Sequence, residues 1–112
     1  MKMIFTKEGS TTIAFQENIE LKVFLENLTK EYSKIDKDNI IVNLFSFEVI
    51  TTNDVLEFLQ LSNDHRASKK SFVLVTNKVS YDDVPEELCV VPTIQEAKDI
   101  IEMEEIERDL DF

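Results

Sequence analysis

The sequence predicts an α/β domain built on a mixed, mostly parallel β-sheet of about five strands, opened by a β-hairpin and packed with helices. Short β-prone runs alternate along the chain with segments whose apolar residues recur at helical spacing. Two runs, 39–45 and 71–76, are almost continuously apolar, as central strands covered on both faces must be. Because 112 residues supply one hydrophobic core but not two, we expect a single domain, 1–112.

A hairpin is expected at the start of the chain. Residues 3–5 and 11–15 are rich in β-forming side chains, and the link between them contains Gly9, the only glycine. A brief last strand is expected at 88–91. Strands that alternate with helices pair in parallel, so the hairpin should add an antiparallel edge to the sheet.

Three amphipathic helices are expected between and after these strands. One begins near Asn18, one runs from about 51 to 68, and one begins after Thr93. Thr51 and Thr93 are each followed three residues later by an acid, which is the spacing of a capping box. The acidic extension 102–112 has six acids and one arginine but keeps spaced apolar residues, so we expect a helix or another ordered segment.

The charge argues against nucleic acid and membrane partners. Twenty-three acids and twelve bases give a formal charge of −11, which repels phosphate backbones and anionic lipids. No apolar run is long enough for a signal-peptide core or a bilayer span. The one cysteine, Cys89, cannot form an internal disulfide, so we expect a cytoplasmic protein.

The order of elements and two short motifs resemble the STAS-like domains of bacterial anti-sigma factor antagonists. Residues 40–44, Ile-Ile-Val-Asn-Leu, resemble the family strand that ends in Asn-Leu, and 51–55 aligns with the family motif Asp-Ser-Ser-Gly-Leu. In this alignment the family's phospho-accepting serine falls on Asn53, its aspartate on Thr51 and its glycine on Asp54. Asparagine has no hydroxyl, so the resemblance implies this fold without the usual serine phosphorylation switch.

The resemblance implies a regulator that docks on a protein partner, an anti-sigma factor or a serine kinase-like protein, through the loop and helix at 51–58. The candidate partner-binding residues are Thr51, Thr52, Asn53, Asp54, Val55 and Phe58. Thr51 and Thr52 are also candidate phosphorylation sites, because negative charge is favourable at a helix N-terminus. The alternative is that they only cap the helix, and that Asp54 complements its dipole rather than imitating a phosphorylated state.

No catalytic residue, cofactor or metal site is predicted. General acid or base catalysis by His65, the only histidine, would need a nucleophile or carboxylate beside it, so we interpret it as a solvated residue near a helix end. A metal-dependent ribonuclease would need several such ligands and is excluded. We interpret Cys89 as a core residue with a raised thiol pKa. The acids around Pro85 are interpreted as a solvated loop rather than a cation site.

Two other functional classes stay open. The chain could be a scaffolding subunit that homodimerises through the exposed edge strand of its hairpin. It could also be an enzyme of unrecognised type, which would need a pocket with convergent polar groups. In the acidic extension, Ile106, Leu110 and Phe112 form an apolar stripe, which either docks on a basic partner groove or closes over the domain's own core.

Overall fold

The computed structural model describes residues 3–17 and 19–110, and its central feature is a five-stranded sheet of order β1-β2-β3-β4-β5. The β1–β2 pair is antiparallel and the three following pairs are parallel, which confirms the mixed sheet opened by a hairpin. Gly9 lies in the hairpin turn at φ +62°, a conformation in which other residues are strained. The strands are β1 Ile4–Glu8, β2 Thr11–Phe15, β3 Asn39–Asn43, β4 Phe72–Val75 and β5 Cys89–Val91.

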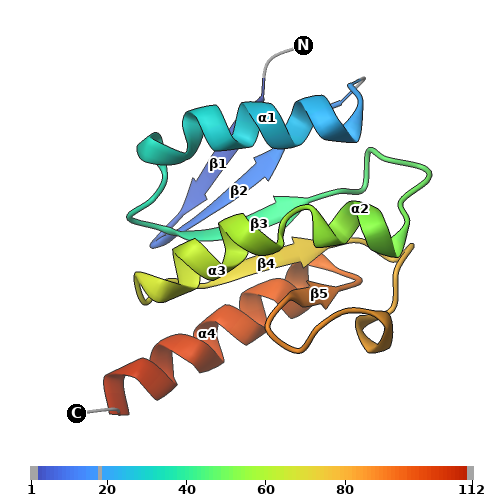
Figure 1. Ribbon diagram of the computed structural model, residues 1–112. Helices are drawn as coiled ribbons and strands as arrows, with labels where there is room; N and C mark the ends of the chain where they lie inside the picture. Colours follow the sequence, from blue (N-terminus) through green and yellow to red (C-terminus); the bar gives the residue numbers. More distant parts are fainter. Residues whose placement is uncertain (1–2, 18, 111–112) are drawn as a thin grey trace.

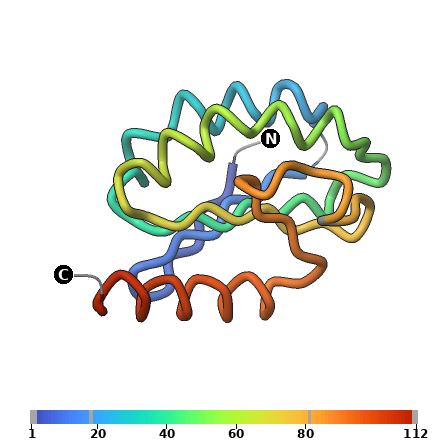
Figure 2. Tube along the Cα trace, turned by 60° about the horizontal axis from the view of Figure 1, so that its bottom comes forward, coloured from blue at the N-terminus to red at the C-terminus, as the bar shows by residue number. Residues whose placement is uncertain are grey.

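Helices cover both faces of the sheet. Helices α1, α2 and α3 lie on one face and α4 lies alone on the other (Figures 1 and 2). Two short 3-10 turns, η1 and η2, follow α1 and precede β5. The bounds are α1 Leu21–Glu31, η1 Tyr32–Lys34, α2 Thr52–Leu56, α3 Leu59–Ala67, η2 Tyr81–Asp83 and α4 Ile94–Leu110. The expected start of the first helix at Asn18 lies outside the described residues.

The two faces of the central strands belong to two separate clusters. Ile40, Val42, Phe72 and Leu74 pack with α1, α2 and α3 in the larger cluster. Ile41, Val73 and Val75 point to the other face and pack with Ala97 and Ile101 of α4. Side chains alternate between faces along a strand, so two covered faces require an almost unbroken apolar run.

The single helix predicted from 51 to 68 was wrong, because the structure divides it into α2 and α3. The N–H groups of Glu57 and Phe58 bond the carbonyls of Asp54 and Val55, three residues back, at 3.3 and 3.0 Å. Such bonds tighten the helix. The ordinary helical bond resumes where Ser62 N–H donates to the Phe58 carbonyl at 2.9 Å. Val55 and Phe58, at the two ends of this tightened turn, are both fully buried.

The interpretation of His65 as a solvated residue was also wrong. Its side chain is 0% exposed and lies between Tyr32 and Phe72. Its Nε2 lies 2.7 Å from the Asp38 carbonyl oxygen, and its Nδ1 lies 2.6 Å from the Tyr32 hydroxyl. A carbonyl can only accept, so the neutral ring carries its proton on Nε2 and accepts from Tyr32 at Nδ1. In this neutral tautomer both ring nitrogens are paired.

Burial shifts both partners of this buried hydrogen bond away from their charged forms. Burial lowers the pKa of His65 below its ordinary 6.5, against a smaller opposing effect of the Asp38 carbonyl. Burial, and then the charges of Asp36 and Asp64, raise the pKa of Tyr32 above 10.0. The phenol therefore remains a donor and the imidazole remains neutral at physiological pH.

The acidic extension is helical as far as Leu110, and a helix was one of the two structures predicted for it. The prediction that its stripe might close over the domain's own core was wrong for Ile106 and Leu110, which are 53% and 68% exposed. Phe112 lies outside the described residues. The second half of α4 lies beside Asn39 and Ser71, where β3 begins and β4 is about to begin, so polar groups rather than apolar ones face it there.

A polar clamp formed by Asn39, Arg66, Ser71, Glu104, Glu105 and Arg108 fastens this half of α4. Glu104 accepts from the Ser71 hydroxyl and pairs with Arg66 at 3.2 Å. Asn39 donates to Glu105 at 3.0 Å, and Arg108 donates to the Ser71 hydroxyl at 3.2 Å. Asn39 and Ser71 are 2% and 0% exposed, so these bonds satisfy polar groups that water does not reach.

We predict that His65 makes the protein less stable as pH falls below 6.5. The unfolded imidazole takes up a proton there, whereas the folded ring, with its lowered pKa, does not. The stabilisation is therefore fully present above 6.5 and is lost as pH falls toward the folded pKa, at a slope that approaches about 1.4 kcal/mol per pH unit.

The control is His65→Gln, which retains a donor and an acceptor but does not titrate. Urea unfolding of both proteins between pH 8 and 5 should show the advantage of the wild type shrinking below pH 6.5. Their difference cancels the effect of the many carboxylates. A difference that stays constant with pH would mean that the buried ring titrates as it does in the unfolded chain.

We predict that Glu104→Gln lowers the free energy of unfolding by about 1–2 kcal/mol, because a hydrogen bond to a charged group is lost in a half-buried place. Glu102→Gln, two residues away on the exposed side of α4, should change it by less than about 0.5 kcal/mol. Urea unfolding at pH 7 measures both. Equal effects would show that the clamp does not stabilise α4.

Candidate partner-binding site

A loop whose backbone is held by hydrogen bonds leads from β3 to the predicted docking residues in and around α2. Phe45 N–H donates to Asn43 Oδ1 at 3.0 Å, and Phe47 N–H donates to the Leu44 carbonyl at 3.1 Å. The Ser46 hydroxyl donates to the Gln16 carbonyl at 2.7 Å, which ties this loop to the one after β2. Parallel strands end at one edge of the sheet, so both loops meet there (Figure 1).

The loop buries some of its apolar residues and exposes others. Phe47 and Ile50 are 9% and 6% exposed and join the larger core cluster. Phe45 and Val49 are 46% and 81% exposed, although both are large and apolar. Buried anchors therefore hold two exposed apolar side chains in place just before α2.

The first turn of α2 has the capping box that the sequence predicted. Thr51 Oγ1 accepts from Asp54 N–H at 3.2 Å, and Asp54 Oδ2 accepts from Thr51 N–H at 2.9 Å. Thr51 and Asn53 are exposed, whereas Thr52 and Asp54 are partly buried. The two carboxyl-terminal positions of the predicted docking set behave differently. Val55 and Phe58 are fully buried, so they position α2 and cannot themselves contact a partner.

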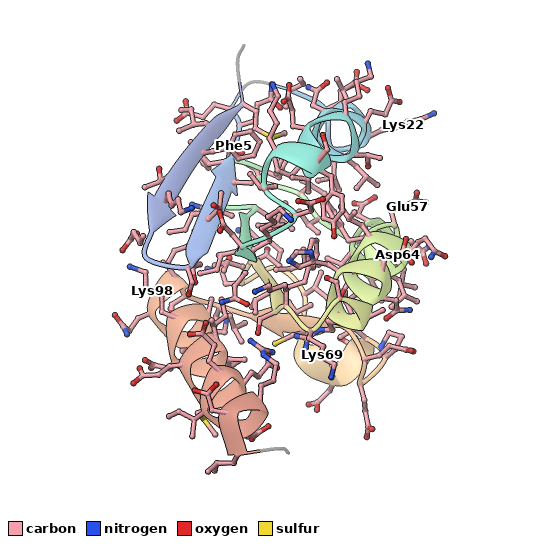
Figure 3. The ribbon with its side chains drawn as sticks, turned by 90° about the vertical axis from the view of Figure 1, so that its left-hand side faces the viewer. Phe5, Lys22, Glu57, Asp64, Lys69 and Lys98 are labelled. Carbon is pink, nitrogen blue, oxygen red and sulfur yellow. The ribbon has the colours of Figure 1, made fainter. Side chains whose placement is uncertain are left out.

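A shallow cleft of about 340 Å³ separates α1 from the end of α2. Leu21, Lys22 and Leu25 line it on one side, and Asp54, Glu57 and Phe58 on the other. Figure 3 shows Lys22 and Glu57 on the same side of the molecule, one on each wall. The cleft extends the exposed surface of α2 toward α1.

Sequence reasoning missed Phe45, Val49 and Lys22. A signal for the first two was present, because 45–50 contains four apolar residues in a segment between a strand and a capping box, where a solvated loop would be polar. Lys22 gave no signal, since a lysine on an amphipathic helix is ordinary.

The one histidine and the one cysteine of the sequence both lie away from the surface of α2. No cluster of three or more His, Cys, Asp or Glu residues suited to a metal ion occurs within 3–17 and 19–110. His65 is sealed in the core, and Cys89 lies half-buried on β5. Burial raises the pKa of the Cys89 thiol, as predicted, although the residue is less buried than a core residue. None of the helices in the described part of the chain could cross a bilayer.

Two solved structures resemble this fold over most of their length. No protein-family model and no curated protein matches the sequence. RsbS from Moorella thermoacetica gives a TM-score of 0.64 at 11% identity, covering 91% of this chain and 96% of that one. A candidate anti-sigma factor antagonist from Thermotoga maritima gives 0.64 at 20% identity, covering 89% and 94%. The chain therefore has the STAS-like fold of anti-sigma factor antagonists, which the sequence predicted.

Proposed function

We propose that this protein is a non-enzymatic regulator that binds a protein partner through the α2 surface, defined as Phe45, Glu48, Val49, Thr51, Thr52, Asn53, Asp54 and Glu57. The partner class is an anti-sigma factor or a serine kinase-like protein, by likeness of fold to anti-sigma factor antagonists. The observation that carries the proposal is the exposure of Phe45 and Val49 on a hydrogen-bonded loop beside α2.

A fixed loop makes such side chains effective contacts. Burying a Phe or Val side chain is worth about 1.5–3 kcal/mol, and ordering a flexible segment would offset part of that gain. Here the loop is already held by bonds from Phe45, Ser46 and Phe47. The surface also carries exposed Glu48 and Glu57, so a partner with basic residues around an apolar patch would complement it.

We also propose that serine phosphorylation does not control whether the α2 surface binds its partner. Asn53 stands exposed at the position of the family's phospho-accepting serine and has no hydroxyl. Thr51 and Thr52 are the remaining hydroxyls of the α2 surface. A phosphoryl group on Thr51 would lie beside the Asp54 carboxylate, which bonds the Thr51 backbone at 2.9 Å, and the two like charges would repel.

A homodimer built through β1 is the alternative, because β1 is an edge strand of the sheet. Its residues Lys7 and Glu8 are exposed, and Glu8 is paired with Lys98 of α4 at 2.9 Å. Charged side chains on an edge strand disfavour pairing with a second chain, which weighs against this alternative.

We predict that the double variant Phe45→Ser, Val49→Ser binds its partner at least about tenfold more weakly than the wild type, because it loses the apolar contacts without a change of charge. The partner is first recovered from native lysate on immobilised protein and identified by mass spectrometry. The affinity of the purified pair is then measured by isothermal titration calorimetry.

The matched control is Ile4→Ser, which removes an apolar side chain, 53% exposed, from β1. It should bind like the wild type, and thermal unfolding should show all three proteins folded. Recovery of no anti-sigma factor or kinase, or equal affinities for all three, would contradict the proposal. A concentration-dependent mass in sedimentation would favour the homodimer instead.

We predict that the recovered kinase transfers no phosphate to the wild type and does phosphorylate Asn53→Ser, which restores a hydroxyl at an exposed position. Phosphate incorporation from labelled ATP measures this. Incorporation in the wild type that disappears in Thr51→Val, Thr52→Val would instead establish a threonine switch.

A further inference from the structure

A second, larger groove lies at the β5 edge of the sheet, lined by residues of α3, of the segment that leads into β5, of β5 itself and of α4. It has a volume of about 1230 Å³. Its apolar lining includes Val84, Pro85, Leu88, Val90 and Ile100. We call it the β5 groove. It shares no residue with the α2 surface.

The β5 groove continues into an exposed apolar seam on α4. Met103, Ile106 and Leu110 are 62%, 53% and 68% exposed. Their spacing of three and four residues places them on one line along the helix, as in the seam of a coiled coil. Ile100, which lines the groove, precedes Met103 by one turn and joins the groove to the seam.

The seam lies on a different face of α4 from the residues that pack in the core. The buried face of α4 consists of Ala97 and Ile101, and its polar clamp through Glu105 and Arg108 holds the second half of the helix to the sheet. The clamp fixes the rotation of α4 about its axis. The exposed seam is therefore held toward solvent by contacts on the opposite side.

The charge around both parts is strongly negative. Asp82, Glu86, Glu87, Glu96, Asp99 and Glu104 line the groove. The only base among its described lining residues is Arg66, which is already paired with Glu104 at 3.2 Å. Glu102, Glu107 and Asp109 flank the seam and are exposed.

We propose that the β5 groove and the α4 seam together bind a basic amphipathic helix of a partner protein. An apolar channel beside a helical seam fits the apolar face of one further helix, and acidic flanks complement its lysines or arginines. A second copy of this chain would bring acids against acids and is disfavoured for the same reason. This interaction is separate from the one proposed for the α2 surface.

The test uses an 18-residue helical peptide of leucine and lysine, with leucine at coiled-coil spacing and a fluorescein label. Fluorescence anisotropy at 150 mM salt measures its affinity for the full chain. We expect binding, and at least tenfold weaker binding of a scrambled peptide of the same composition, whose leucines do not share a face. Equal binding of both peptides would mean attraction by net charge alone and would overturn the proposal.

Two pairs of variants locate the site. Met103→Ser, Leu110→Ser should weaken binding at least tenfold at unchanged charge, whereas Ile4→Ser, Val23→Ser, at two exposed apolar positions outside both surfaces, should not. Likewise Glu96→Gln, Asp99→Asn should weaken it, whereas Glu17→Gln, Glu26→Gln, with the same change of net charge at exposed positions outside both surfaces, should not. Equal effects within either pair would overturn the proposal.

Sedimentation of the wild type without peptide tests whether a second copy of this chain occupies the seam instead of a basic helix. We expect a monomer at every concentration. A dimer that Met103→Ser, Leu110→Ser abolishes would assign the seam to a second copy and overturn the basic-helix proposal. Because none of these variants changes a residue of the α2 surface, failure here leaves the α2 surface proposal untouched.

Discussion

The two-sided burial of β3 and β4 is the constraint on which the other features of this structure depend. Every side chain from Ile40 to Val42 and from Phe72 to Val75 is fully buried. Strands with no solvent-exposed face must be covered by helices on both sides. Strands that are connected through such crossover helices run parallel. Parallel strands in turn end together, so the loops after β2 and β3 meet at one edge and join α2 into a surface.

At the opposite ends of these strands, where β3 and β4 begin, buried polar residues need hydrogen-bond partners. There β3 begins at Asn39 and the chain enters β4 through Ser71, and both residues are buried although they are polar. The clamp from α4 satisfies them, and the nearby ring of His65 satisfies the Asp38 carbonyl. Apolar packing holds the helices against the sheet, and the hydrogen bonds at this end of the strands fix their positions. These hydrogen bonds have a cost, because protonation of His65 at Nδ1 would remove the acceptor of the bond that the Tyr32 hydroxyl donates.

Periodicity predicted which faces are covered, but not what covers them. The apolar runs at 39–45 and 71–76 required a doubly covered sheet, and the spacing of Thr51 and Asp54 required a helix start. The burial of His65 was within reach too, because Val55, Phe58, Ser62 and His65 follow one another at three or four residues. The polarity of the histidine concealed it, since only the distant Tyr32 and Asp38 show that its nitrogens are paired. The break at Glu57 and the burial of Val55 and Phe58 depend on tertiary packing, which overrides local pattern.

The surplus of apolar side chains carries the functional argument further. A domain that used its apolar residues only for folding would leave exposed ones scattered singly. Among the described residues, Ile4 and Val23 are exposed singly, but the others gather in two places, Phe45 with Val49 beside α2 and Met103 with Ile106 and Leu110 on α4. Each group is held outward by bonds on its inner side, the loop bonds in one case and the clamp in the other. Both lie among acids, so both proposed surfaces would favour basic partners. Two such surfaces on different sides of one rigid domain would let it hold two basic partners at once.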